Sequence, residues 1–128
     1  MPKKVIIVDD SKAVVATAEL ALEEMINTNQ IEFVSYLNPM QLLEALQNGS
    51  ETFDLLISDV NMPQLNGLEL AKAIKSDDRY KTKPIIILTT EGSNEMKMAG
   101  KEIGVTGWMV KPFSDEKLVK TLKMLLGI

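Results

Sequence analysis

The sequence predicts an α/β fold, a doubly wound parallel β-sheet with helices on both faces. Short apolar runs rich in β-branched residues alternate along the 128 residues with segments of helical spacing, and this alternation is typical of parallel sheets. The run Ile85–Leu88 is apolar at every position, which indicates a strand buried on both faces. With 45% hydrophobic and 25% charged residues, the composition favours one globular domain over residues 1–128.

Five segments are expected to form the strands. Each is short and mainly apolar, and each is followed by polar or turn-forming residues. The segments are Val5–Val8, Ile31–Tyr36, Phe53–Ser58, Pro84–Thr89 and Gly107–Val110. Right-handed crossovers through the intervening helices would join them as parallel strands.

The first two of five expected helices follow the first two strands. Apolar residues recur at steps of three and four from Val14 to Met25, which is the spacing of one helix face. The second helix is expected to begin with Asn38 as its cap and Pro39 as its first residue, and to stop at Gly49.

The last three helices differ in the strength of their signals. Leu70 and Ile74 mark the third helix. The fourth, Asn94–Ile103, has the weakest signal because Gly100 lowers its helix propensity. The fifth opens at Ser114, a cap with two acidic residues in the following turn, and continues with leucines at helical spacing.

The composition excludes several classes of function. Fourteen basic against 18 acidic residues give a net charge of −4, which argues against general nucleic-acid binding. The chain has no Cys and no His, so it has no thiolate metal site, no Ser-His-Asp triad and no phosphohistidine of its own. Strictly aliphatic runs of four residues and an N-terminus without a signal-peptide pattern predict no membrane segment and a cytoplasmic location.

Polar residues follow four of the predicted strands, at the edge where such sheets bind ligands. Asp9 and Asp10 come after the first strand, Asp59 after the third, Thr89 ends the fourth and Lys111 follows the fifth. Clustered carboxylates need compensating positive charge, and hard oxygen ligands suit Mg²⁺, with Mn²⁺ as an alternative. Together with a lysine and a hydroxyl, these groups can receive a phosphoryl group on a carboxylate nucleophile.

Taken singly, each of these residues has an ordinary structural role. Two aspartates after a strand often cap a helix, Asp59 precedes a proline-containing loop, and Thr89 can bond backbone groups at a strand end. It is their joint position at the carboxyl ends of strands that favours a function. Other motifs do not fit, because Gly92–Lys101 lacks P-loop spacing and Pro63 stands where a calcium loop needs a ligand. A metabolic aspartyl-phosphate hydrolase would use Asp-x-Asp after the first strand, and the sequence there is Asp9-Asp10-Ser11, which lacks this motif.

The motifs resemble those of response regulator receiver domains, and among these the CheY-like stand-alone chemotaxis regulators. The matching runs are Val8-Asp9-Asp10-Ser11, Asp59-Val60-Asn61-Met62-Pro63 with Gly67, Pro84–Thr89 and Lys111-Pro112-Phe113. The resemblance implies a flavodoxin-like (βα)5 fold with strand order 2-1-3-4-5, an order for which CheY itself is a standard example.

The resemblance also implies a role for each site residue. It makes Asp59 the phosphoacceptor, and it makes Asp10, Asp59 and the backbone carbonyl of Asn61 ligands of Mg²⁺, with Asp9 acting through a water molecule. Lys111 would pair with the phosphoryl group and Thr89 would bond to it. The Lys111–Pro112 peptide is expected to be cis.

Three further residues have roles by the same resemblance. Trp108 stands at the position of the switch aromatic residue, which is more often Tyr or Phe. It would respond to the movement of Thr89, although an indole that only packs or binds a partner is the alternative. Thr90 and Glu91 would border the access to the site, and Thr90 would slow the hydrolysis of the acyl phosphate.

The output surface is expected on the fourth helix, the fifth strand and the fifth helix. Met96, Lys97, Met98, Lys101 and Trp108 lie in or near it. Met and Trp are common contact residues at interfaces, and lysines suit an acidic peptide. The alternative for Met96 and Met98 is a place in the core.

Partners also follow from the resemblance. The phosphodonor would be a CheA-type histidine kinase, because this chain has no His. The target would be a flagellar motor switch protein, and a phosphatase is a further candidate partner. The chain would be a monomeric switch that catalyses its own phosphorylation and slow dephosphorylation, not a metabolic enzyme, and would bind neither nucleic acid nor membranes. The alternative is a phosphate sink or phosphorelay intermediate that binds only histidine-phosphotransfer domains.

Overall fold

Strands and helices alternate along the chain from Lys3 to Leu126. The computed structural model describes residues 2–90 and 92–128. The elements are β1 (Lys3–Val8), α1 (Lys12–Ala21), α2 (Glu23–Asn27), β2 (Ile31–Tyr36), α3 (Pro39–Asn48), β3 (Leu55–Ser58), α4 (Gly67–Lys75), β4 (Ile85–Thr89), α5 (Asn94–Ile103), β5 (Gly107–Val110) and α6 (Asp115–Leu126).

The strands form one parallel sheet in the order β2-β1-β3-β4-β5. The expected fold class, a flavodoxin-like doubly wound sheet with order 2-1-3-4-5, is therefore confirmed. The order reverses between β1 and β3, where Val8 lies opposite Ser58. Because the connections that follow β1 and β3 leave in opposite directions, a crevice for ligands is expected between them at the carboxyl edge of the sheet.

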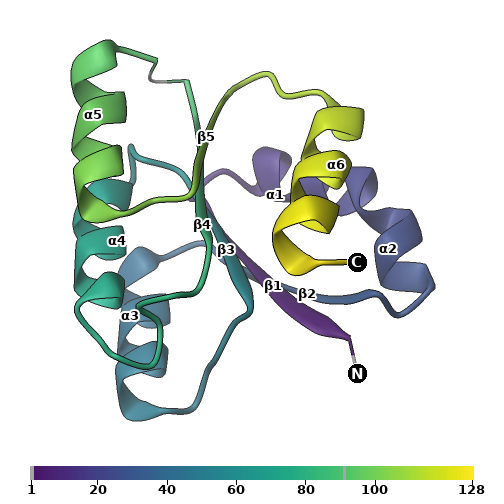
Figure 1. Ribbon diagram of the computed structural model, residues 1–128, viewed down its shortest axis with the longest axis horizontal. Helices are drawn as coiled ribbons and strands as arrows, with labels where there is room; N and C mark the ends of the chain where they lie inside the picture. Colours follow the sequence, from purple (N-terminus) through teal and green to yellow (C-terminus); the bar gives the residue numbers. More distant parts are fainter. Residues whose placement is uncertain (1, 91) are drawn as a thin grey trace.

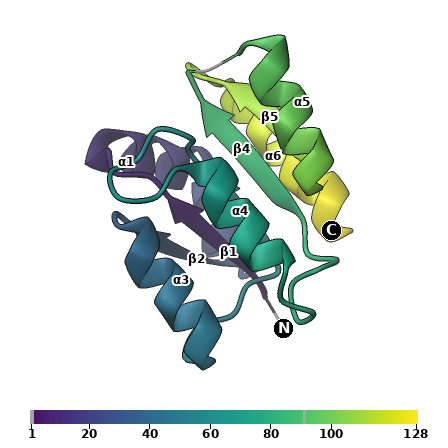
Figure 2. The same cartoon turned by 90° about the vertical axis from the view of Figure 1, so that its left-hand side faces the viewer.

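Both faces of the sheet are buried, because alternate residues of each central strand enter two separate cores. In β1, Val5 and Ile7 face the core covered by α1, α2 and α6, whereas Ile6 and Val8 face the core covered by α3, α4 and α5. Figure 1 shows the two helix layers on either side of the sheet, and Figure 2 shows the α3, α4 and α5 layer toward the viewer. Burial on both faces explains why the central strands have no polar alternation.

The first predicted helix is wrong in one respect, because it is divided into α1 and α2 at Leu22. Leu22 leaves helical geometry with φ −99° and ψ 7°. The hydrogen bonds continue across it, from Leu22 N to Ala18 O (3.1 Å) and from Ile26 N to Leu22 O (3.0 Å). Ala18, Leu22 and Met25 all remain buried. The apolar spacing therefore continues through the break, and no Gly or Pro marks it in the sequence.

Several predicted helix boundaries are confirmed. Asn38 caps α3 by accepting from Met40 N (2.8 Å), and the helix ends at Gly49, whose φ is +83°. Ser114 caps α6, and α5 has the predicted bounds Asn94–Ile103.

Gly100 is explained by packing. A Cβ added to Gly100 would lie 3.1 Å from Trp108 Cζ3 and 3.0 Å from Val105 Cγ2. The indole therefore occupies a notch in α5 that the missing side chain leaves, and we call this arrangement the Gly100–Trp108 notch. The glycine that lowers helix propensity is needed for the contact between α5 and β5.

Candidate phosphoryl-accepting site

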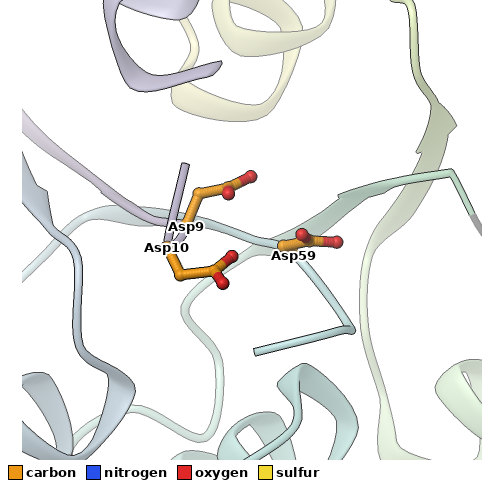
Figure 3. Close-up of side chains that lie close together, drawn as sticks. All are labelled: Asp9, Asp10 and Asp59. Carbon is orange, nitrogen blue, oxygen red and sulfur yellow. The ribbon is translucent and has the colours of Figure 1, made fainter. Parts of the chain in front are cut away.

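Three aspartates meet at the carboxyl edge of the sheet. Asp9 and Asp10 directly follow β1, and Asp59 directly follows the neighbouring strand β3 (Figure 3). Backbone bonds from Asp9 N to Tyr36 O and from Asp59 N to Val8 O, both 3.1 Å, hold the two strand ends in place. One carboxylate oxygen of each aspartate lies within 4.8 Å of those of the others. The sheet thus brings together residues that are about 50 positions apart in the sequence.

Lys111 completes the group from β5, which is separated from β3 by β4. It follows β5, and its backbone N donates to Thr89 O (2.8 Å). Its Nζ lies 2.7 Å from Asp9 Oδ2 and 3.3 Å from Asp59 Oδ2. The Lys111–Pro112 peptide is cis, as the resemblance implied. We call Asp9, Asp10, Asp59 and Lys111 the carboxyl-end cluster.

The Asp9 carboxylate is buried, with 1% of the residue exposed. Burial raises the pKa of its carboxyl group, and the negative charge of Asp59 adds to the increase. Hydrogen bonds from Lys111 and from the Ser11 backbone N (2.9 Å) lower the pKa. The increase prevails, so the bonds from Lys111 and Ser11 do not fully offset the effect of burial on the pKa of Asp9.

Asp59 is held in one orientation. Its Oδ1 accepts a bond from Val60 N (2.7 Å), while its Oδ2 faces Lys111. The backbone around it leaves no room for a side chain at Gly67, where a Cβ would lie 1.9 Å from the carbonyl oxygen of Asp59. Gly67 N in turn donates to Val60 O (2.8 Å). Gly67 is thus a positioning residue, which the sequence showed only as part of the matching motif.

The other predicted site residues lie around this group. Thr89 is fully buried at the end of β4, and Asn61 lies two residues after Asp59. Thr90 is exposed and, with Lys111, lines a mostly apolar cleft of about 360 Å³ between the start of α1 and the loop before α6. Glu91, the other residue expected at the access to the site, lies outside the described residues.

The residues of the expected partner surface fall into two groups. Lys97, Met98 and Lys101 on α5 are exposed, Met98 by 63%. Met96 and Trp108 are half-buried and pack against the core on the α4–α5 side of the sheet. Exposed Val110 and Met124 were not singled out from the sequence. Val110 stands in an apolar strand and Met124 beside core leucines, so neither residue type signals exposure.

The donor atoms of the site fit a hard divalent cation. Three carboxylates lie together, and the one ammonium of Lys111 is bonded to two of them. Oxygen donors and excess negative charge are what Mg²⁺ and Mn²⁺ require in proteins.

No helix among the described residues is long and apolar enough to cross a bilayer.

Comparison with known proteins identifies the relatives of this chain. The model of the response regulator receiver domain matches residues 5–123. Chemotaxis protein CheY1 of Helicobacter pylori strain 26695 is 34% identical over 124 residues, which are 97% of each chain. Chemotaxis protein CheY of Pseudomonas aeruginosa PAO1 is 29% identical over 122 residues, 95% of this chain and 94% of the relative. The solved structure of CheY4 from Vibrio cholerae has a TM-score of 0.86 and 40% identity, and covers 98% of this chain and 100% of its own.

Proposed function

The chain belongs to the response regulator receiver domain family, and from this premise we propose that it accepts a phosphoryl group on Asp59 from a histidine kinase. The observation that carries the proposal is Asp59 itself, fixed by Val60 N and facing the Lys111 ammonium in a cluster of carboxylates. The donor is a phosphohistidine on another protein, of the CheA type, because this chain has no His.

The transfer step makes one bond and breaks one. A carboxylate oxygen of Asp59 forms a bond to phosphorus as the bond between phosphorus and the donor imidazole nitrogen breaks. The imidazole keeps the electron pair and takes a proton from water. Lys111 remains beside the transferred oxygens, where its ammonium stabilises the developing negative charge.

Asp10, Asp59 and the backbone carbonyl of Asn61 would hold Mg²⁺, and Asp9 would act through a water molecule. There the ion would supply positive charge to neutralise the transferred phosphoryl oxygens. Asp9 positions the Lys111 ammonium through their 2.7 Å contact. Thr90 borders the route by which water reaches the acyl phosphate, and the apolar cleft beside it offers contact area to a donor protein.

The signal leaves the site through Thr89 and Trp108. The Thr89 hydroxyl donates to a phosphoryl oxygen, and Trp108 lies on the neighbouring strand, packed in the Gly100–Trp108 notch of α5. A change at Thr89 biases the position of the indole, and with it the surface formed by Met96, Lys97, Met98, Lys101 and Trp108. This is a two-state switch rather than a metabolic enzyme.

The output is control of flagellar motor rotation through a motor switch protein. Support comes from the relatives, which carry the name chemotaxis protein and match this chain over nearly their full length. Exposed Lys97 and Lys101 suit an acidic peptide, and Met98 supplies an apolar contact. We place the protein in the cytoplasm as a monomeric receiver domain of residues 1–128.

Calorimetric titration with an N-terminal peptide of the flagellar motor switch protein tests the output. Binding is measured with Mg²⁺ alone and with Mg²⁺ and beryllofluoride, a phosphoryl mimic. We expect affinity to rise several-fold with the mimic in the wild-type chain and to stay unchanged in Asp59→Asn. Absence of binding in both states would contradict a motor output and favour the phosphate sink that binds histidine-phosphotransfer domains.

A further inference from the structure

A groove runs between the α1–α2 helices and the outer strand β2, beside which α2 lies in Figure 1. Its volume is about 470 Å³. Apolar side chains line it, from Ala16, Leu20, Ile26 and Phe33. Leu20 is 69% exposed, although a large aliphatic side chain of this kind favours burial. We call this the β2-edge groove.

The β2-edge groove has an acidic rim. Glu19 and Glu23 line it and are exposed, and Glu24 follows on the same helix. Within the part of the chain that the structure describes, no Lys or Arg lines the groove. Its apolar floor is therefore bordered by negative charge alone.

The charge of the whole molecule reinforces this local pattern. None of the 14 basic residues lies between Lys12 and Lys72, whereas nine of the 18 acidic residues do. That segment contains most of α1, all of α2, β2, α3 and β3, which together form the β2 side of the sheet. Eleven of the basic residues lie from Lys72 onward, and three of these, Lys117, Lys120 and Lys123, are on α6, which packs beside α1. The excess of acidic residues in this segment favours a positively charged ligand at the groove.

The groove is separate from the carboxyl-end cluster. The α1 helix begins at the carboxyl end of β1, and the chain returns through α2 to its amino end, where Lys3 N donates to Gln30 O (3.0 Å). The groove is lined by residues from the middle of α1 onward, and it shares none with the cluster. Binding there is thus compatible with an occupied phosphoryl site.

We propose that the β2-edge groove binds a cationic amphipathic segment of a partner protein. An apolar side chain of the segment packs against Leu20 and Phe33, and flanking Lys or Arg residues pair with Glu19 and Glu23. Helical peptides commonly bind grooves in this way, through apolar anchors on one face. The acidic rim repels nucleic acids and anionic membranes, which leaves a basic protein segment as the matching ligand. The proposal does not rest on the proposed phosphorylation.

The test is NMR titration of the isotope-labelled full chain with a synthetic amphipathic peptide of Leu and Lys, in excess Mg²⁺ so that the carboxyl-end cluster does not attract the lysines. We expect shift changes confined to α1, α2 and β2, with equal affinity in the presence and absence of beryllofluoride. A Leu/Glu peptide of the same pattern should not bind.

Matched variants locate the binding. Leu20→Ala should weaken it about tenfold, while Met124→Ala, an equally exposed apolar residue on α6, should not change it. Glu19→Gln with Glu23→Gln should weaken binding about fivefold and reduce its salt dependence. The charge-matched control Glu44→Gln with Glu102→Gln, on α3 and α5, should have at most a small effect.

Three outcomes would overturn the proposal. Shift changes spread over every acidic surface, or equal losses in the control and groove variants, would show unspecific attraction. Shift changes centred on Asp9, Asp10 and Asp59 would place the peptide at the other end of the sheet. Self-association of the chain that Leu20→Ala abolishes, measured by sedimentation, would make a second copy the occupant instead of a partner.

Discussion

The two ends of the sheet each hold a buried carboxylate bonded to a lysine, yet their electrostatic balance is opposite. At the amino end, Glu51 accepts from the Lys4 ammonium, from the Tyr36 hydroxyl (2.7 Å) and from Thr52 N (3.2 Å). Burial raises the pKa of Glu51, but these three donors together hold it below its usual value. At the carboxyl end, the pKa of Asp9 is raised.

The difference lies in the number of donors for each negative charge. We call Glu51, Lys4 and Tyr36 the amino-end cluster, although the Tyr36 backbone stands at the carboxyl end of β2. With Lys4, the Tyr36 hydroxyl and Thr52 N, the Glu51 carboxylate has three donors. In the carboxyl-end cluster, Asp9 accepts from Lys111 and Ser11 N and Asp59 from Lys111 and Val60 N, so each has two donors and the two carboxylates share one ammonium. A satisfied ion pair stabilises the fold, whereas a cluster with excess negative charge favours the binding of a cation. The comparison thus distinguishes a cluster with a structural role from the cluster for which we propose a function.

Loss of phosphorylation is the largest effect that separates the two clusters. Asp59→Asn removes the nucleophile and should abolish labelling by a small-molecule phosphodonor, measured by intact-protein mass spectrometry. Glu51→Gln, the matched carboxylate-to-amide change at the amino end, should retain labelling under conditions where it is folded. Stable labelling of Asp59→Asn at another residue would contradict the assignment.

Mg²⁺ should stabilise the protein through the carboxyl end alone. At a concentration one hundred times its Kd, the ion should raise the free energy of unfolding by about 2.7 kcal/mol. Urea denaturation measures this effect, which we expect in the wild type and in Glu51→Gln. Asp10→Asn removes a carboxylate from the site and should lose most of it. Equal stabilisation of Asp10→Asn would place the ion elsewhere.

Replacement of a carboxylate by an amide should change the free energy of unfolding in opposite directions at the two ends. Glu51→Gln leaves the Lys4 ammonium without its carboxylate and should lower the free energy of unfolding by about 2 kcal/mol. Asp9→Asn relieves repulsion among three carboxylates and should leave stability unchanged or raise it by about 1 kcal/mol. Urea denaturation of both variants without divalent metal provides the test. A comparable loss in both would remove the distinction between the clusters.

The pH dependence of stability should differ in sign, as the smallest of these effects. The folded pKa of Glu51 is lowered, so its contribution is present above its usual pKa of 4.5 and is lost as pH falls through the folded pKa. The pKa of Asp9 is raised in the folded state. The free energy of unfolding therefore declines as pH rises from the usual Asp value of 3.8 through the folded pKa. The free energy of unfolding of Glu51→Gln should therefore approach that of the wild type in acid. That of Asp9→Asn should rise relative to the wild type as pH rises. Parallel stability curves without metal would refute both assignments.

Most of the fold and the carboxylate cluster could be predicted because their signals are local. The buried run of β4 and the cap at Asn38 depend on residues close in sequence, and the topology of a parallel sheet places Asp9 and Asp59 at one edge. The roles of Asp59, Asn61 and Thr89 remain predictions from the family resemblance. Their positions agree with those roles without testing them.

What the sequence did not show depends on packing between distant segments. Lys4, Tyr36 and Glu51 belong to no motif, and only the fold brings them together. Gly100 had a clear meaning for helix propensity but none for packing, because its reason is Trp108 on the next strand. The break at Leu22 likewise leaves the apolar spacing intact. Pairwise tertiary contacts of this kind have no periodicity that a single sequence can display.

The Gly100–Trp108 notch gives the molecule a built-in optical reporter. The chain contains a single Trp, and its indole lies against the helix whose movement would carry the signal. Intrinsic fluorescence therefore reports on one defined contact, with no label attached and no second indole to obscure it. A stopped-flow trace on adding a phosphodonor would test whether the ring leaves α5 and how fast, and Trp108→Phe would be silent at the same wavelengths.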